Sequence, residues 1–165
     1  MTGRLLLPLF LTLGLVATSL AETPKEAIQK RYDELSQLEK KKDAQALEKA
    51  YRLNAASNFM YVDLFQNTYD IDVSVAQYVK QLDRVEDYVQ NSNTITDIRR
   101  DGLNYVCTVK TVLDAFLDPD HKRHLQGVSI SEDIWTNTIA GWKMLKSHVT
   151  KESAKMNGKP IISKG

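Results

Sequence analysis

Asp133-Ile134-Trp135-Thr136-Asn137-Thr138-Ile139-Ala140-Gly141-Trp142-Lys143 is the stretch that decides the fold, because it predicts two strands joined by a tight turn at Ala140-Gly141. The first strand extends back to His124, and the second runs from Trp142 to Glu152. Both flanks are rich in apolar and β-branched residues, which favour strands. We therefore predict a closing hairpin over residues 124–152.

The chain before this hairpin is also typical of strands, back to residue 93. Thr94–Arg99 leads into a turn at Asp101-Gly102, and Tyr105–Phe116 alternates with β-branched residues before a turn at Asp118-Pro119-Asp120. Short turns between consecutive strands favour antiparallel neighbours. The second half of the chain is thus predicted to be an antiparallel meander.

The first half of the chain has the periodicity of helices. Apolar residues at three- and four-residue steps predict a helix from Pro24 to Lys41. A second helix begins after Asp43, its N-cap, and ends near Asn54. Alternation then predicts a short strand over 59–65, and a third helix begins after Asp72 or Ser74 and ends near Val89. Helices first and strands afterwards indicate an α+β fold, in which three helices from the N-terminal half pack on a curved antiparallel sheet.

The N-terminus has the pattern of a cleavable signal peptide over residues 1–21. Arg4 precedes an apolar run from Leu5 to Val16, and Ser19-Leu20-Ala21 supplies small residues before Glu22. A membrane anchor is the alternative, but the run is shorter than the roughly 20 residues that a spanning helix needs. We expect an exported protein, periplasmic or extracellular, without stable membrane insertion after cleavage. Residues 22–152 then form one domain, and residues 153–165 are expected to be a polar tail.

Charge and cysteine content narrow the function classes. The formal net charge is +1, with 22 basic and 21 acidic residues, so no basic excess favours nucleic acid as a partner. Cys107 is the single cysteine, within an apolar strand, and is expected to be a buried hydrophobe; an intermolecular disulfide or a reactive thiol is the alternative.

Metal and phosphate chemistry have little support. His121 and His124 belong to a polar turn, so a solvated turn explains them better than a metal site does. The chain has no phosphate-binding glycine loop and no nucleophile elbow. We expect neither a metal nor another cofactor.

Two stretches resemble those of a known superfamily. Asn58-Phe59-Met60-Tyr61-Val62-Asp63 resembles the hydrophobic strand ending in Asp that follows the second helix of SnoaL-like proteins, and residues 133–143 resemble their closing hairpin. With the order of elements over residues 24–152, the chain resembles the nuclear transport factor 2-like (NTF2-like) superfamily, which includes ketosteroid isomerase. Many relatives have Gly shortly after the strand Asp, where this chain has Leu64-Phe65-Gln66-Asn67.

The resemblance implies a cone-shaped, cystatin-like roll with a conical apolar pocket between sheet and helices. It also implies a homodimer formed through the convex sheet face. Since the superfamily holds both enzymes and binding proteins, fold does not settle function. We expect an exported module that binds a small apolar or amphipathic molecule or a protein partner. The alternatives are a cofactor-independent isomerase, dehydratase or cyclase, and a non-catalytic scaffold subunit with a filled cone.

Three residues are candidates for catalysis in such a pocket. Asp63, held among aromatic residues, would be the base, and Tyr32 would donate to a developing oxyanion. His148 lies on the same predicted strand face as Trp142 and is a further acid–base candidate.

Each candidate also has a purely structural interpretation. Asp63 would accept backbone amides at a strand end, and Tyr32 would be a core aromatic. The ligand-binding candidates are Tyr61, Phe65, Trp135 and Trp142. Asp133 and Trp135, in the closing hairpin, are more simply a strand-end hydrogen bond and a packing aromatic.

Overall fold

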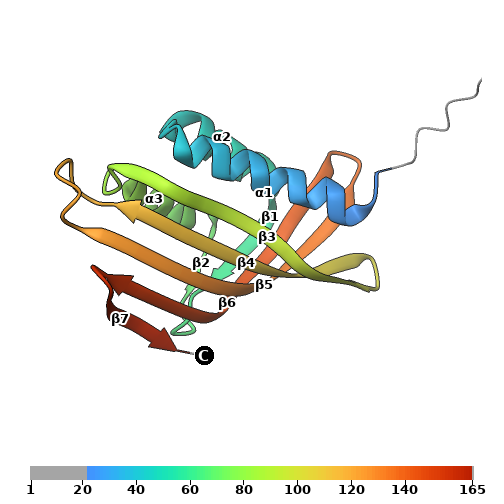
Figure 1. Ribbon diagram of the computed structural model, residues 1–165. Coiled ribbons are helices and arrows are strands. Elements are labelled where there is room, and N and C mark those ends of the chain that lie inside the picture. Colours follow the sequence, from blue (N-terminus) through green and yellow to red (C-terminus); the bar gives the residue numbers. More distant parts are fainter. Residues whose placement is uncertain (1–21, 165) are drawn as a thin grey trace, which may run out of the picture.

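The computed structural model describes residues 22–164, so the predicted signal peptide lies outside the described residues. Three helices lie against a strongly curved seven-stranded sheet (Figure 1). The elements, in chain order, are α1 (Pro24–Lys40), α2 (Ala44–Asn54), β1 (Ala55–Val62), β2 (Thr68–Tyr69), α3 (Ile71–Leu82), β3 (Asp87–Asp101), β4 (Asn104–Phe116), β5 (His124–Thr138), β6 (Gly141–Met156) and β7 (Lys159–Lys164).

The first two helices begin and end where the sequence predicts. Thr23 caps α1 in a reciprocal capping box with Glu26, and Pro24 occupies the first turn, where its missing amide hydrogen costs nothing. Asp43 caps α2 by accepting from the Ala46 amide at 3.0 Å. Local capping therefore determines both N-termini.

The third helix is shorter than predicted. It begins at Ile71, capped by Asp70, and ends at Leu82 rather than near Val89. Residues from Asp87 onward instead pair with β4, where Asp87 lies opposite Phe116. The long β3–β4 ladder thus takes residues that helical periodicity alone assigned to the helix.

The sheet order is β2-β1-β6-β5-β4-β3, and β7 pairs with the C-terminal part of β6, from Glu152 to Met156. The meander from β3 to β6 is antiparallel, as predicted. The predicted packing of three helices on a curved sheet is confirmed, but the sheet is mixed rather than antiparallel throughout, because β1 runs parallel to β6, with Tyr61 opposite Ser147. A parallel pair needs a long connection, here supplied by the chain from β2 to β5.

Two β-bulges in β6 change which of its residues face the helices. The pairing with β5 skips Leu145 and again skips Thr150, so the alternation of faces reverses at each of these positions. Met144, Ser147 and Glu152 therefore share the concave side. Bulges also increase local bend and twist, which suits the curvature of the sheet.

The predicted polar tail over residues 153–165 is wrong for the part that the structure describes. β6 continues to Met156, and Asn157-Gly158 turns the chain into β7 with φ of 50° and 77°. Two consecutive positive φ values are those of a type I′ turn, for which Asn-Gly is the strongest sequence signal. A polar composition thus does not prevent a hairpin here.

The core lies between α1 and the concave face of the sheet. Trp135 is fully buried there, and Cys107 is fully buried beside it, which confirms the predicted burial of the thiol. A second cluster, of Leu35, Leu47 and Leu82 with Ala50, holds the three helices together. Within residues 22–164, no helix has the length and apolarity needed to cross a membrane.

Candidate ligand-binding cavity

A cavity of about 310 Å³ lies between the concave face of the sheet and the helices. Its wall combines apolar side chains such as Leu35, Phe59 and Val109 with many hydroxyl, amide and carboxyl groups. The expectation of an apolar pocket is therefore too simple. The volume is at the small end of the range for small-molecule sites.

One end of the cavity holds a buried chain of hydrogen bonds. The Tyr32 hydroxyl, from α1, donates to Asp133 Oδ2 at 2.5 Å and accepts from Trp135 Nε1 at 3.0 Å. Strand alternation in β5 explains the placement, since Ser131, Asp133 and Trp135 point to one side. Helix and sheet are thus joined through polar groups at this end.

Asp133 lies in a strongly desolvated setting. It is 3% exposed, and burial raises the pKa of its carboxyl above 3.8. The hydrogen bond from Tyr32 and the nearby hydroxyls of Ser147 and Ser131 lower this pKa, but they do not cancel the effect of burial. By the geometry of the described residues, Asp133 Oδ1 itself has no hydrogen-bond partner. Burial and the neighbouring carboxylate also raise the pKa of Tyr32 well above its ordinary value.

A second carboxyl group lies further along α1. Glu39 accepts from the Tyr51 hydroxyl at 3.1 Å and from Asn91 Nδ2. Burial raises the pKa of Glu39, although these two hydrogen bonds act in the opposite direction. Tyr51 stacks on Tyr78 of α3, with ring centroids 4.7 Å apart. Both oxygens of Glu39 are therefore engaged, unlike those of Asp133.

Asn54 supplies a second unpartnered polar atom. It is the last residue of α2, is 4% exposed, and its Nδ2 has no hydrogen-bond partner within residues 22–164. Asn54 and Asp133 both line the cavity. Leaving a buried polar group without a partner costs about 1–3 kcal/mol, which a bound polar group would recover.

Asp63, the predicted base, lies outside the cavity. Its Oδ1 accepts from the amides of Phe65 and Asn67 at 2.8 Å each, and its Oδ2 accepts from Asn67 Nδ2. Hydrogen bonds from Asn67 lower the pKa of Asp63, and the one from the Asn67 side chain has the largest effect. Gln66 adopts φ of 69° in this turn, a left-handed conformation that is uncommon for a residue other than glycine. The structural interpretation of Asp63, as an acceptor of backbone amides at a strand end, is confirmed.

The other sequence-predicted site residues separate into two groups. Tyr32 and Tyr61 line the cavity. His148 contacts Gln66 outside it, because the bulge at Leu145 turns this part of β6 over. Phe65 is exposed.

The two tryptophans do not line the cavity either. Trp135 packs in the core behind Tyr32, to which its indole donates, so its interpretation as a packing aromatic is confirmed. Trp142 packs edge-to-face against Tyr105, with ring centroids 5.3 Å apart. The structure therefore brings together only part of the predicted site.

Glu39 and Asn54 are cavity residues that the sequence did not suggest, and for Asp133 the sequence favoured a structural role. For Asp133, the signal was available in the spacing of Ser129, Ser131 and Asp133 at every second position of one strand. Glu39 and Asn54 carry no such signal, because polar residues near helix C-termini are ordinarily solvated. Within residues 22–164, no group of three or more His, Cys, Asp or Glu side chains gathers as a metal site would require.

Asp133→Asn is expected to alter how stability depends on pH. Because burial raises the folded-state pKa of Asp133, the folded wild type binds more protons than the unfolded chain above pH 3.8, and its free energy of unfolding falls as pH rises. The variant lacks this titration, so its stability relative to wild type should increase from pH 4 toward neutrality. Thermal unfolding across this range measures the difference. Glu34→Gln, which removes an exposed carboxyl on α1, is the control; a pH-independent difference for Asp133→Asn would contradict the argument.

No protein-family model and no curated protein sequence matches the chain. Solved structures do resemble it. One is an NTF2-like protein from Cytophaga hutchinsonii, with 12% identity, a TM-score of 0.59 and coverage of 78% of this chain and 98% of that one. Another is an NTF2-like protein with a cystatin-like fold from Novosphingobium aromaticivorans, with 14% identity, a TM-score of 0.53 and coverage of 75% and 79%.

A third similar structure, from Streptomyces avermitilis, is described as a candidate dehydratase of the NTF2-like family. It has 13% identity and a TM-score of 0.57, and the match covers 84% of this chain and 96% of that one. Likenesses at such identities concern the path of the backbone, and they agree with the resemblance drawn from the sequence.

Proposed function

From the NTF2-like fold of this chain, we propose that it binds a small amphipathic molecule in the cavity between sheet and helices. This fold supports a ligand-binding module or one of isomerase or dehydratase type. The observation that carries the proposal is the pair of buried, unpartnered polar atoms, Asp133 Oδ1 and Asn54 Nδ2, on residues that line the cavity. A ligand with polar groups at these two atoms and an apolar body along Leu35 and Val109 would complete the site.

A second candidate function is cofactor-independent acid–base catalysis. Its support is the Tyr32–Asp133 hydrogen bond, since a desolvated carboxyl with a raised pKa can exchange protons and a phenol can stabilise a developing oxyanion. In this version Asp133 takes the role that the sequence assigned to Asp63, and Tyr32 keeps its own. A scaffold with a filled cone is less well supported, because a cavity remains between the described elements.

Native mass spectrometry of the gently purified protein tests the binding proposal. We expect extra mass that denaturation releases. Ser147→Leu, which narrows the cavity beside Asp133, should lose this mass, whereas Ser153→Leu, on an exposed position of the same strand, should keep it. Retention of the mass by Ser147→Leu would contradict binding in the cavity. Turnover of the identified ligand that Asp133→Asn abolishes without loss of affinity would select the catalytic version.

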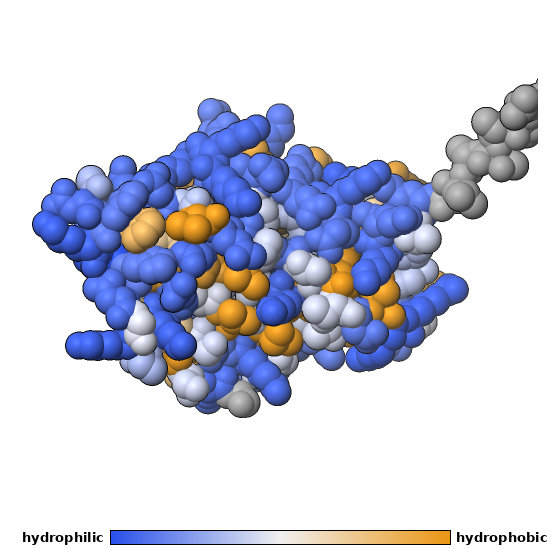
Figure 2. Space-filling model, in the orientation of Figure 1, coloured by the Kyte–Doolittle hydropathy of each residue, from blue (hydrophilic) through white to orange (hydrophobic). Residues whose placement is uncertain are grey.

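We also propose export with cleavage after Ala21, and a homodimer formed through the outer face of the sheet. Figure 2 shows apolar side chains among hydrophilic ones on the visible face of the molecule. On β5, Val128 is 38% exposed, and Ile130 and Ile134 are half-buried. The same spectrum reports both features. We expect each chain to begin at Glu22, and we expect the intact complex to have twice the mass of one such chain. An intact N-terminus or a monomer would contradict the respective proposal.

A further inference from the structure

We infer that the ligand of this cavity is an organic cation, a small molecule in which a protonated amine or quaternary ammonium is attached to an apolar or aromatic body. The inference rests on the proposed binding function and names its ligand class. It follows from the charge of the cavity wall, the aromatic rings in it, and the free oxygen of Asp133.

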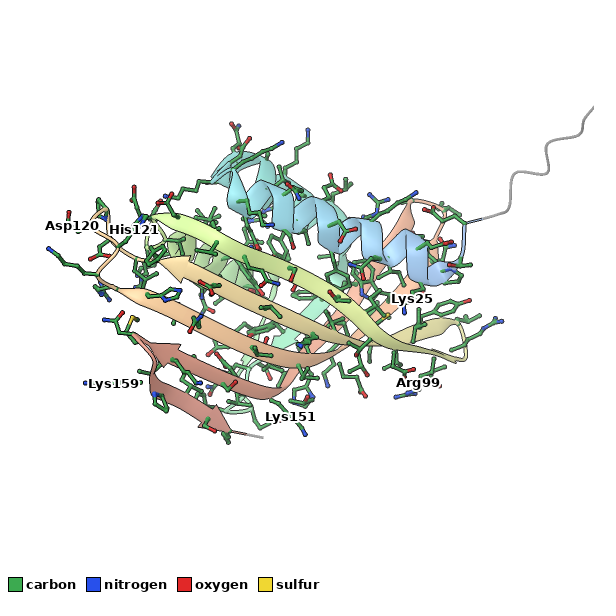
Figure 3. The ribbon with its side chains drawn as sticks, viewed as in Figure 1. Lys25, Arg99, Asp120, His121, Lys151 and Lys159 are labelled. Atoms are coloured by element: carbon green, nitrogen blue, oxygen red, sulfur yellow. The ribbon has the colours of Figure 1, made fainter. Side chains whose placement is uncertain are left out.

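The charge of the wall is one-sided. Three carboxyl groups line the cavity, those of Glu39, Asp133 and Glu152, whereas no Lys, Arg or His does so within residues 22–164. The chain as a whole is nearly neutral, so this imbalance is local. Arg99, Lys151 and Lys159 are exposed and point away from the body of the molecule (Figure 3). A wall of this kind disfavours anions and favours a positive charge.

Aromatic rings are concentrated in the same wall. Five of the seven tyrosines line the cavity, together with Phe59, and they come from α1, α2, β1, α3 and the start of β3. The tyrosines are Tyr32, Tyr51, Tyr61, Tyr78 and Tyr88. The face of an aromatic ring attracts ammonium groups, most strongly where water is excluded.

The carboxylates and the phenols act on one another. Burial is the main cause that raises the pKa of Tyr61 to about 12, and the nearby negative charges of Glu152, Asp63 and Asp133 contribute to the same shift. Burial and Glu39 raise the pKa of Tyr88 to about 12 as well. The tyrosines therefore stay neutral, and their rings lie within the field of the carboxyl groups.

Asp133 supplies the point of attachment. Its Oδ2 is held by Tyr32, while its Oδ1 is buried and unpartnered. Since Glu39 has hydrogen bonds to both oxygens, Asp133 is the carboxyl group with a free buried acceptor. An ammonium group donating to Oδ1 would satisfy this atom and compensate the buried charge. The three carboxyl groups do not gather as metal ligands do, so a single metal ion does not fit the arrangement.

Calorimetric titration of the protein with three probes of similar shape tests the inference: 2-phenylethylamine, 2-phenylethanol and phenylacetate at pH 7. We expect the amine to bind at least about tenfold more tightly than the alcohol, and phenylacetate to bind most weakly. Equal or tighter binding of the alcohol or the acid would overturn the inference while leaving the binding function intact. If no probe binds and the native spectrum carries no ligand mass, both proposals fail.

Variants separate charge recognition from structural damage. Asp133→Asn should weaken amine binding by at least about tenfold and weaken alcohol binding far less, because the asparagine keeps an acceptor oxygen but loses the charge. Glu152→Gln, at a half-buried position, should weaken amine binding in the same direction and provides a second variant if Asp133→Asn does not fold. Glu34→Gln, an exposed carboxyl on α1 that does not line the cavity, should change neither affinity. Equal losses for amine and alcohol in both cavity variants would overturn the inference.

Discussion

Trp135→Ala is expected to lower the free energy of unfolding by about 3–5 kcal/mol, the largest effect of any single substitution considered for this protein. Trp135 is fully buried in the cluster between α1 and the sheet, and its ring packs edge-to-face on Tyr32 with centroids 5.6 Å apart. Removing the indole leaves a cavity and deprives Tyr32 of a hydrogen-bond donor. Chemical denaturation followed by circular dichroism measures the loss.

Trp142→Ala is the matched control for this prediction. Trp142 is half-buried and packs against Tyr105 away from the ligand cavity, so its removal creates less empty volume. We expect a loss of about 1–2 kcal/mol, in the ordinary range for a partly exposed side chain. Equal losses for the two tryptophans would show that Trp135 is not the centre of the core.

Tyr32→Phe should cost about 2–4 kcal/mol, although it removes a single oxygen atom. The reason is that two buried groups, Trp135 Nε1 and Asp133 Oδ2, lose their partner together. The ring itself remains, so packing is preserved and the loss reports on hydrogen bonding alone.

Tyr105→Phe is the corresponding control, because Tyr105 is half-buried and the structure assigns its hydroxyl no role in the cavity. Its free energy of unfolding should stay within about 0.5 kcal/mol of wild type. A loss of less than about 1 kcal/mol in Tyr32→Phe would mean that the freed groups find other partners.

The fold class and the positions of α1, α2, β4 and β5 could be predicted because their signals are local. Helix caps such as Thr23 and Asp43, and turns such as Asp101-Gly102, act within a few residues. The end of α3 could not be predicted, because residues 87–89 satisfy both a helical period and a strand that pairs with β4. Contacts that are distant in sequence decided between the two.

The candidate site was harder to predict, and β6 shows why. Strict alternation places His148 on the same face as Trp142 and Met144, but the bulge at Leu145 brings Ser147 to the cavity instead. A bulge depends on the register with the neighbouring strand and leaves no clear mark in its own sequence. Asp63 and Asp133 illustrate the same limit, since the sequence places both in strand-like stretches, whereas in the structure Asp63 lies in a turn after β1 and Asp133 lies buried within β5.

The parallel pairing of β1 with β6 has a consequence for the order in which the protein assembles. Tyr61 pairs with Ser147, so one wall of the cone needs residues from the second and the last quarters of the chain. During synthesis β1 emerges before β3, β4 and β5, and it must wait for β6 before the strand that pairs with it along its length exists. Contacts so far apart in sequence form slowly, and unpaired apolar surface attracts other chains in the meantime. The nascent N-terminal half is therefore the stage at which a chaperone would be needed.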